Sequence, residues 1–127
     1  MLTASTTRSK KVLSLTDRQL NIPFLIDTGA DVSIIPATAS DRMKKPISFL
    51  HAANGTGIPV YGERSLPIDF HLRRTFRWVF LVASVNQPII GADFLAHFDL
   101  LVDLRKRCLI DNVTALKSAG VSRDSIK

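Results

Sequence analysis

Residues 24–36 read Phe-Leu-Ile-Asp-Thr-Gly-Ala-Asp-Val-Ser-Ile-Ile-Pro, and no other stretch of the sequence is as informative. The apolar residues before Asp27 predict a strand, so this carboxylate comes where the strand ends. A hydroxyl and a glycine follow it: Thr28 can tie the loop by hydrogen bonds, and Gly29 lets backbone N–H groups approach the carboxylate closely. The β-branched residues that follow predict a second strand, which stops at Pro36. The pattern predicts an acidic group at the floor of a cleft.

On both sides of this stretch, short apolar segments are separated by turn-forming residues about every 8 to 12 positions, which is typical of an all-β protein. Residues 12–16 and 22–26 predict a hairpin that leads into the Asp27 loop. Residues 37–45 predict a surface loop with at most one helical turn. Residues 49–61 predict a mobile β-arm, because its tip, Asn54-Gly-Thr-Gly57, carries two glycines that permit positive φ.

The second half of the sequence has the same β-character with one exception. Further strands are predicted over 66–72, 75–82, 100–104 and 108–110, with a bend at Arg73-Arg74. Phe94, Leu95 and Phe98 have helical spacing instead, so we expect one short helix over about 92–98.

Composition limits the kind of protein. The chain has 127 residues, of which 46% are hydrophobic and 22% charged, which suits one folded domain. Its apolar runs are too short to cross a membrane, and residues 1–11 lack the apolar centre of a secretory signal. The single cysteine, Cys108, fits a reducing, cytosolic setting without a disulfide or a zinc site. A net charge of +6 permits weak, non-specific attraction to nucleic acid.

Several segments together resemble the retroviral-type aspartic proteases (retropepsins), and most closely those of gypsy-type LTR retrotransposon polyproteins. Besides the Asp27 motif, they are Ala52-Ala-Asn-Gly-Thr56, Tyr61-Gly-Glu-Arg-Ser-Leu66, Leu72-Arg-Arg-Thr-Phe-Arg-Trp-Val-Phe80 and Pro88-Ile-Ile-Gly-Ala-Asp-Phe-Leu95. The resemblance covers about residues 12–111. It implies an all-β acid-protease barrel with one short C-terminal helix, acting as a homodimer, and it implies no metal and no cofactor.

The resemblance also implies roles for individual residues. Asp27 would be the catalytic aspartate, Thr28 would brace the paired loops across the dimer, and Gly29 completes the signature. Gly91 would pack against the catalytic loop as a structural residue. The residues implied to contact the substrate are Ala30 and Asp31 in the loop, Ile34 and Ile89 in the cleft walls, and Asn54, Gly55, Thr56 and Gly57 at the tip of the flap.

The sequence departs from this family at one place. Many retroviral members have an arginine directly after the glycine equivalent to Gly91, and it pairs with the aspartate equivalent to Asp31. This chain has Ala92-Asp93 instead. We therefore expect a weaker dimer.

The mechanism itself requires a second copy of the chain. It uses two carboxylates that share one proton around a water molecule, because two like charges about 3 Å apart cannot both ionise. The sequence has a single Asp-Thr-Gly and no Asp-Ser-Gly. Two chains must therefore each supply an Asp27, related by a two-fold axis.

These features predict an aspartic endopeptidase that cleaves the polyprotein from which it is excised, in cytoplasmic retrotransposon particles. Residues 12–113 would form the protease domain, 1–11 a flexible N-terminal flank, and 114–127 a C-terminal flank or linker. One alternative is a non-catalytic, protease-like module that binds peptides or nucleic acid. Another is a basic capsid-associated domain, which explains the charge but not the motif.

Other polar residues have simpler interpretations. Asp69, Asp93, Asp99 and Asp103 are expected to be solvated or to cap turns and helices. The arginines of 73–77, which alternate with Phe76 and Trp78, could form a nucleic-acid stripe. Strand alternation, with arginines outside and aromatic rings inside, explains them more simply.

Overall fold

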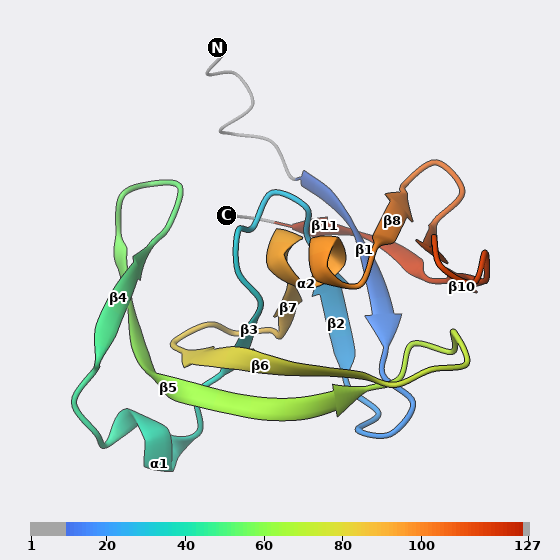
Figure 1. Ribbon diagram of the computed structural model, residues 1–127. Coiled ribbons are helices and arrows are strands. Elements are labelled where there is room, and N and C mark those ends of the chain that lie inside the picture. Colours follow the sequence, from blue (N-terminus) through green and yellow to red (C-terminus); the bar gives the residue numbers. More distant parts are fainter. Residues whose placement is uncertain (1–9, 126–127) are drawn as a thin grey trace.

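A computed structural model describes residues 10–125 as a large and a small β-sheet with two short helices (Figure 1). The eight strands of the large sheet are β1 (Lys10–Thr16), β2 (Pro23–Ile26), β3 (Ile34–Pro36), β4 (Ser48–His51), β5 (Gly57–Ile68), β6 (Phe76–Ala83), β7 (Ile89–Ile90) and β11 (Val121–Ser125). The small sheet contains β8 (Leu100–Asp103), β9 (Cys108–Asp111) and β10 (Lys117–Ala119), and the helices are α1 (Ala39–Arg42) and α2 (Ala92–His97). The predicted β-rich fold with few helices is confirmed. Neither helix of the described residues has the length and apolarity that a membrane span requires.

The two-residue strand β7 occupies the centre of the large sheet, whose order is β11-β1-β2-β7-β3-β6-β5-β4. It runs parallel to β2 on one side and antiparallel to β3 on the other. Since β2 and β3 flank the Asp27 motif, the loop between them must pass over the end of β7. This topology brings Gly91 and the start of α2 to the motif from more than 60 residues away in sequence.

The predicted hairpin of β1 and β2 is confirmed, with Leu13 opposite Ile26. Its turn is held by Asp17, a fully buried carboxylate that accepts hydrogen bonds from the backbone N–H groups of Leu20 and Asp69. The Arg18 N–H also donates to the Asp69 carbonyl oxygen at 2.8 Å. The turn is thus fixed to the loop between β5 and β6.

The predicted arm is formed by β4 and β5, paired from Ser48↔Val60 to His51↔Gly57. Asn54 closes its tip, because its side-chain oxygen accepts the Thr56 N–H at 2.9 Å. Gly55 has a φ of 85°, whereas Gly57 does not adopt a positive φ. Only one of the two tip glycines is therefore required by the turn.

The strand predicted over 66–72 ends earlier than expected. β5 stops at Ile68, and residues 69–75 form a loop in which His71 and Arg73 have φ values of 66° and 62°. Phe70 and Leu72 are nevertheless fully buried. Alternating burial in this loop imitates the pattern of a strand, which is why the sequence suggested one.

The core is largely aromatic. Phe24, Phe70, Phe76, Phe80 and Phe94 are each no more than 1% exposed, and their rings contact one another with centroids 5.8–6.3 Å apart. Such edge and tilted contacts add to the free energy gained by burying the rings. The burial of Phe76 agrees with the strand alternation that places aromatic rings inside.

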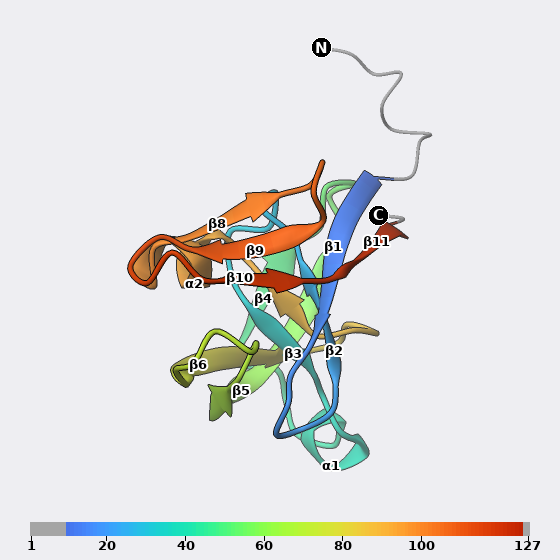
Figure 2. The same cartoon turned by 90° about the vertical axis from the view of Figure 1, so that its right-hand side faces the viewer.

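Part of the segment expected to be a C-terminal flank or linker, 114–127, forms strands in the structure. β10 pairs with β9, and β11 pairs with β1 over five residues, from Lys10↔Ser125 to Ser14↔Val121 (Figure 2). Gly120 lies between them so tightly that a Cβ there would be 2.6 Å from the Ser14 oxygen. β10 and β11 are therefore held by pairing with β9 and β1, although their sequence shows no alternating pattern that would predict strands. The N-terminal flank, 1–11, lies mostly outside the described residues.

An ion pair between the half-buried Arg74 and the fully buried Asp111 joins the β5–β6 loop to the small sheet. The Arg74 guanidinium donates to both oxygens of Asp111, at 2.7 and 3.0 Å, and to the Phe98 carbonyl oxygen at 3.0 Å. Burial alone would raise the pKa of Asp111, but the hydrogen bonds from Arg74 and from the Val113 N–H together bring it below its ordinary value of 3.8. A lowered pKa means that folding favours the ionised form.

We therefore expect Asp111→Asn to lower the free energy of unfolding by about 2 kcal/mol at pH 7, since Arg74 is partly exposed and the pair is partly screened. The contribution is present above pH 3.8 and is lost as the pH falls through the lowered pKa. Urea unfolding at pH 7 and at about pH 3 should therefore show a smaller difference between variant and wild type at the lower pH. An unchanged difference would contradict this assignment.

Candidate active site

Asp27 lies at the end of β2, and backbone groups hold it on both sides. Its N–H donates to the Ile90 carbonyl oxygen of β7 at 2.9 Å, and its Oδ1 accepts the Gly29 N–H at 3.0 Å. The residue is 2% exposed. A buried carboxylate needs hydrogen-bond donors, and the Gly29 N–H supplies one.

Gly91 packs directly against the loop that follows Asp27. A Cβ at this position would lie 2.5 Å from the Val32 carbonyl oxygen and 2.8 Å from that of Ala30, closer than side-chain carbons approach other atoms. The next residue donates its N–H to the Ala30 oxygen at 2.7 Å. Only glycine permits this approach, and the resulting contact fixes the height of the loop over β7.

Ser33 and Asp93 form a second link between the loop and α2. The Ser33 hydroxyl accepts the Gly91 N–H at 2.8 Å and donates to Asp93 Oδ1 at 2.7 Å, and the Ser33 N–H donates to Asp93 Oδ2 at 3.2 Å. Ser33 is 1% exposed. Asp93 also accepts the Phe94 N–H in the first turn of α2, as expected of a capping residue, so its bond to Ser33 is a role that the sequence did not suggest. Because Asp93 binds Ser33, it stabilises the loop within one chain.

The structure brings the predicted loop residues together. Thr28, Gly29 and Asp31 are exposed, and Ala30 is half-buried. Their backbone is nevertheless fixed, since Ala30 N–H donates to the Asp27 carbonyl oxygen and the Asp31 oxygen accepts from Asp93 N–H. The loop therefore exposes the side chains of Thr28 and Asp31 while hydrogen bonds fix its backbone.

The two predicted cleft-wall residues, Ile34 and Ile89, are direct partners across β3 and β7. Ile34 is 6% exposed and packs with Val60 and Ala83, whereas Ile89 is half-buried. Both residues lie next to the Asp27 loop, as a cleft wall requires. However, Val60 and Ala83 already cover most of the Ile34 side chain.

The predicted flap residues 54–57 are all exposed. They form the tip of the β4–β5 arm. Figure 1 shows the tip of the arm and the loop between β2 and β3 at the same end of the molecule. In that loop, Thr28, Gly29 and Asp31 are exposed as well.

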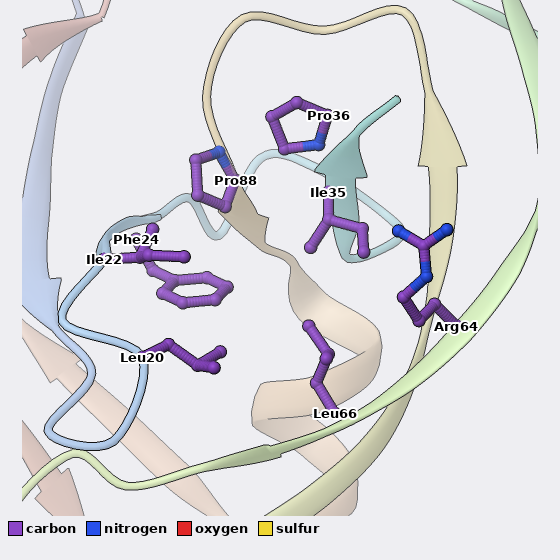
Figure 3. Close-up of a pocket in the computed structure, with 8 residues that line it drawn as sticks. All are labelled: Leu20, Ile22, Phe24, Ile35, Pro36, Arg64, Leu66 and Pro88. Carbon is purple, nitrogen blue, oxygen red and sulfur yellow. The ribbon is translucent and has the colours of Figure 1, made fainter. Parts of the chain in front are cut away.

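The base of the arm is fixed by a network of polar contacts. Asp41 of α1 accepts the Thr38 N–H at 2.9 Å and lies 3.3 Å from the Arg64 guanidinium of β5. The hydrogen bonds from Thr38 lower the pKa of Asp41, and Arg64 adds to this effect. An apolar pocket of about 290 Å³ lies beside this contact, where Leu20, Ile22 and Phe24 of the first hairpin face Leu66 of β5 (Figure 3). It contains none of the predicted site residues.

Comparison with known proteins agrees with this geometry. The family model described as "Retroviral aspartyl protease" matches residues 7–103. The retroviral protease-like domain of Ddi1 from Leishmania major is similar in structure, with a TM-score of 0.61 and 19% identity over 91% of this chain and 94% of that one. The EIAV protease in complex with the inhibitor HBY-793 has a TM-score of 0.52 and 20% identity over 77% of this chain and 95% of that one. No curated protein sequence matches the chain.

Proposed function

Since the chain belongs to the retroviral aspartyl protease family, we propose that it is an aspartic endopeptidase that cleaves polypeptides as a homodimer. One observation carries this proposal: Asp27 is a buried carboxylate at the end of a central strand, its Oδ1 accepts the Gly29 N–H, and its loop packs on Gly91. A module that only binds peptides has no need of a buried carboxylate, so this observation favours catalysis over the non-catalytic alternative.

A homodimer follows from the chemistry of the carboxylate. One chain supplies one Asp27, and the shared-proton mechanism needs two. A two-fold axis beside the loop would bring both Asp27 side chains together, with Thr28 of each chain bracing the pair. The exposure of Thr28 is consistent with a partner there.

In this dimer the two Asp27 carboxyls hold one proton and one water molecule. One carboxylate takes a proton from the water as it attacks the scissile carbonyl carbon, and the other gives its proton to the carbonyl oxygen. Collapse of the tetrahedral intermediate breaks the C–N bond, with proton transfer to the leaving nitrogen. Neither a metal nor a cofactor is needed for these steps.

The remaining predicted residues would hold the substrate. Ala30 lies under the bound peptide in this proposal, Asp31 holds its backbone at the edge of the cleft, and Ile34 with Ile89 forms the apolar wall. The arm tip, 54–57, would close over the peptide.

The biological setting remains a proposal as well. The resemblance to gypsy-type sequences suggests that the enzyme is excised from a retrotransposon polyprotein and cleaves that polyprotein in cytoplasmic particles. Residues 12–113 would be the protease domain, and the pairing of β11 with β1 suggests that part of 114–127 folds with it.

The proposal is tested by incubating the purified protein with a mixed peptide library at mildly acidic pH. Cleavage that a statine-type inhibitor blocks supports it, because such inhibitors place a hydroxyl between the two aspartates. Cleavage that the inhibitor leaves unchanged, or no cleavage at any protein concentration, would reject it.

Dilution should reveal the dimer. At concentrations where the monomer dominates, we expect the rate to rise with the square of protein concentration, because each site takes one Asp27 from each chain. This chain has Ala92 in place of the family's arginine, and its Asp93 is bound to Ser33 of the same chain. We therefore expect the monomer to dominate up to higher concentrations than in relatives that carry the arginine. Peptidase assays over a dilution series measure this. A specific activity that stays constant down to nanomolar protein would contradict weak dimerisation.

The pH dependence should follow a bell. The rate falls at low pH as the pair takes up its second proton, and at high pH as the shared proton leaves. We expect an optimum in the mildly acidic range. A profile that rises steadily through about pH 8 to 9 would instead indicate a histidine, cysteine or metal-bound hydroxide mechanism.

A further inference from the structure

A hollow of about 280 Å³ lies between the β1–β2 turn and the β5–β6 loop, apart from the candidate active site. Figure 1 shows these two loops at the end of the β5–β6 ribbon opposite the arm. The hollow is lined by Arg18, Asp69, His71, Arg73, Arg74 and Thr75. Three of these six residues are arginines and one is acidic, so the lining is strongly basic.

The two loops are held in fixed positions. Buried Asp17 and the Arg18 N–H both bond to the backbone of Asp69, and the Asp69 side chain accepts the His71 N–H at 2.9 Å. The left-handed φ values of His71 and Arg73, unusual for residues with side chains, persist in this bonded loop. The hollow is therefore a preformed feature of the fold.

Arg74 pairs with the carboxylate of Asp111. Among residues 12–123, whose side chains the structure describes, neither Arg18 nor Arg73 forms an ion pair with a carboxylate. Arg18 Nη2 instead donates to His71 Nδ1 at 2.9 Å. Because a guanidinium can only donate, neutral His71 carries its proton on Nε2, which remains a donor.

We propose that this hollow binds a backbone phosphate of a nucleic acid. Guanidinium forks suit the oxygens of a phosphate, and His71 Nε2–H and the Thr75 hydroxyl can add neutral donors. The Asp69 charge weakens attraction to a single small anion. A strand with neighbouring phosphates also gains from the +6 charge of the whole chain, which favours a polyanion as the ligand.

The test measures fluorescence anisotropy of a labelled oligouridylate of about 20 nucleotides at low salt, without peptide substrate. We expect the double variant Arg18→Gln and Arg73→Gln to weaken binding about tenfold and to lower the slope of log affinity against log salt by one to two units. The matched control, Arg105→Gln with Lys106→Gln, removes the same charge from the exposed β8–β9 turn and should weaken binding less than about twofold. The double variant Arg18→Lys and Arg73→Lys keeps the charge but loses the paired N–H donors of the guanidinium groups. It should therefore bind more tightly than the glutamine pair but more weakly than the wild type.

Equal losses in the two glutamine pairs would overturn the proposal, because binding would then depend on overall charge alone. No measurable binding by the wild type would also overturn it. Inorganic phosphate, added at constant ionic strength, should displace the oligonucleotide from the wild type. If phosphate protects the wild type against thermal unfolding while the oligonucleotide does not bind, the ligand is a small phosphate and the nucleic-acid assignment is wrong. Because the readout is binding, these results are independent of peptidase activity.

Discussion

Asp27→Asn is expected to abolish peptide cleavage while leaving the fold intact. The amide is nearly the same size as the carboxylate, and its oxygen can still accept the Gly29 N–H that Asp27 accepts at 3.0 Å. It cannot share the proton on which the paired mechanism depends. We expect kcat to fall by about 10⁴-fold, the upper range for loss of an acid–base group, with an unchanged unfolding midpoint.

Asp31→Asn is the matched control, since it makes the same chemical change four residues away on an exposed side chain. If Asp31 only holds the substrate, its variant should raise KM more than it lowers kcat. Wild-type cleavage rates in purified Asp27→Asn would show that the catalytic assignment is wrong.

Gly91→Ala should damage both stability and activity. The new methyl group would meet the Val32 carbonyl oxygen at 2.5 Å and the Ala30 oxygen at 2.8 Å, so the backbone of the loop must move. Overpacking of this kind costs about 3 kcal/mol of unfolding free energy. Because the same loop carries Asp27, we also expect kcat/KM to fall about 100-fold through misplacement of the carboxylate.

Gly62→Ala provides the comparison for this variant. It adds the same methyl group to a glycine of β5 whose Cβ position has no atom within 4 Å, so stability and activity should stay close to wild type. Urea unfolding and steady-state peptidase assays measure both variants. A Gly91→Ala protein as stable and active as Gly62→Ala would contradict the proposed support of the loop.

Local sequence patterns were sufficient for the elements whose side chains alternate regularly or match helical spacing. The first hairpin, the arm and the helix at Ala92–His97 were all predictable in this way. The Asp27 motif was also visible, because its apolar strand, hydroxyl and glycine are adjacent in the chain. Its link to Gly91 came from a family resemblance and not from spacing.

Other features depend on tertiary contacts that no local pattern records. The bond between Ser33 and Asp93 joins residues 60 positions apart, and it exists because β7 lies between β2 and β3. Phe70 and Leu72 lie in a loop, but both are buried and stand two positions apart, which is the spacing expected of a strand. The polar strand β11 is held by backbone hydrogen bonds to β1, so its side chains carry no signal.

Mixing wild-type and Asp27→Asn chains at a constant total concentration, high enough to keep the protein dimeric, tests the two-chain site most directly. A heterodimer would contain one aspartate and one asparagine and should be inactive. Activity should therefore follow the square of the wild-type fraction, leaving about one quarter in an equal mixture. Activity that falls in direct proportion to the wild-type fraction, leaving about one half, would mean that each chain carries a complete site and would contradict the shared Asp27 pair.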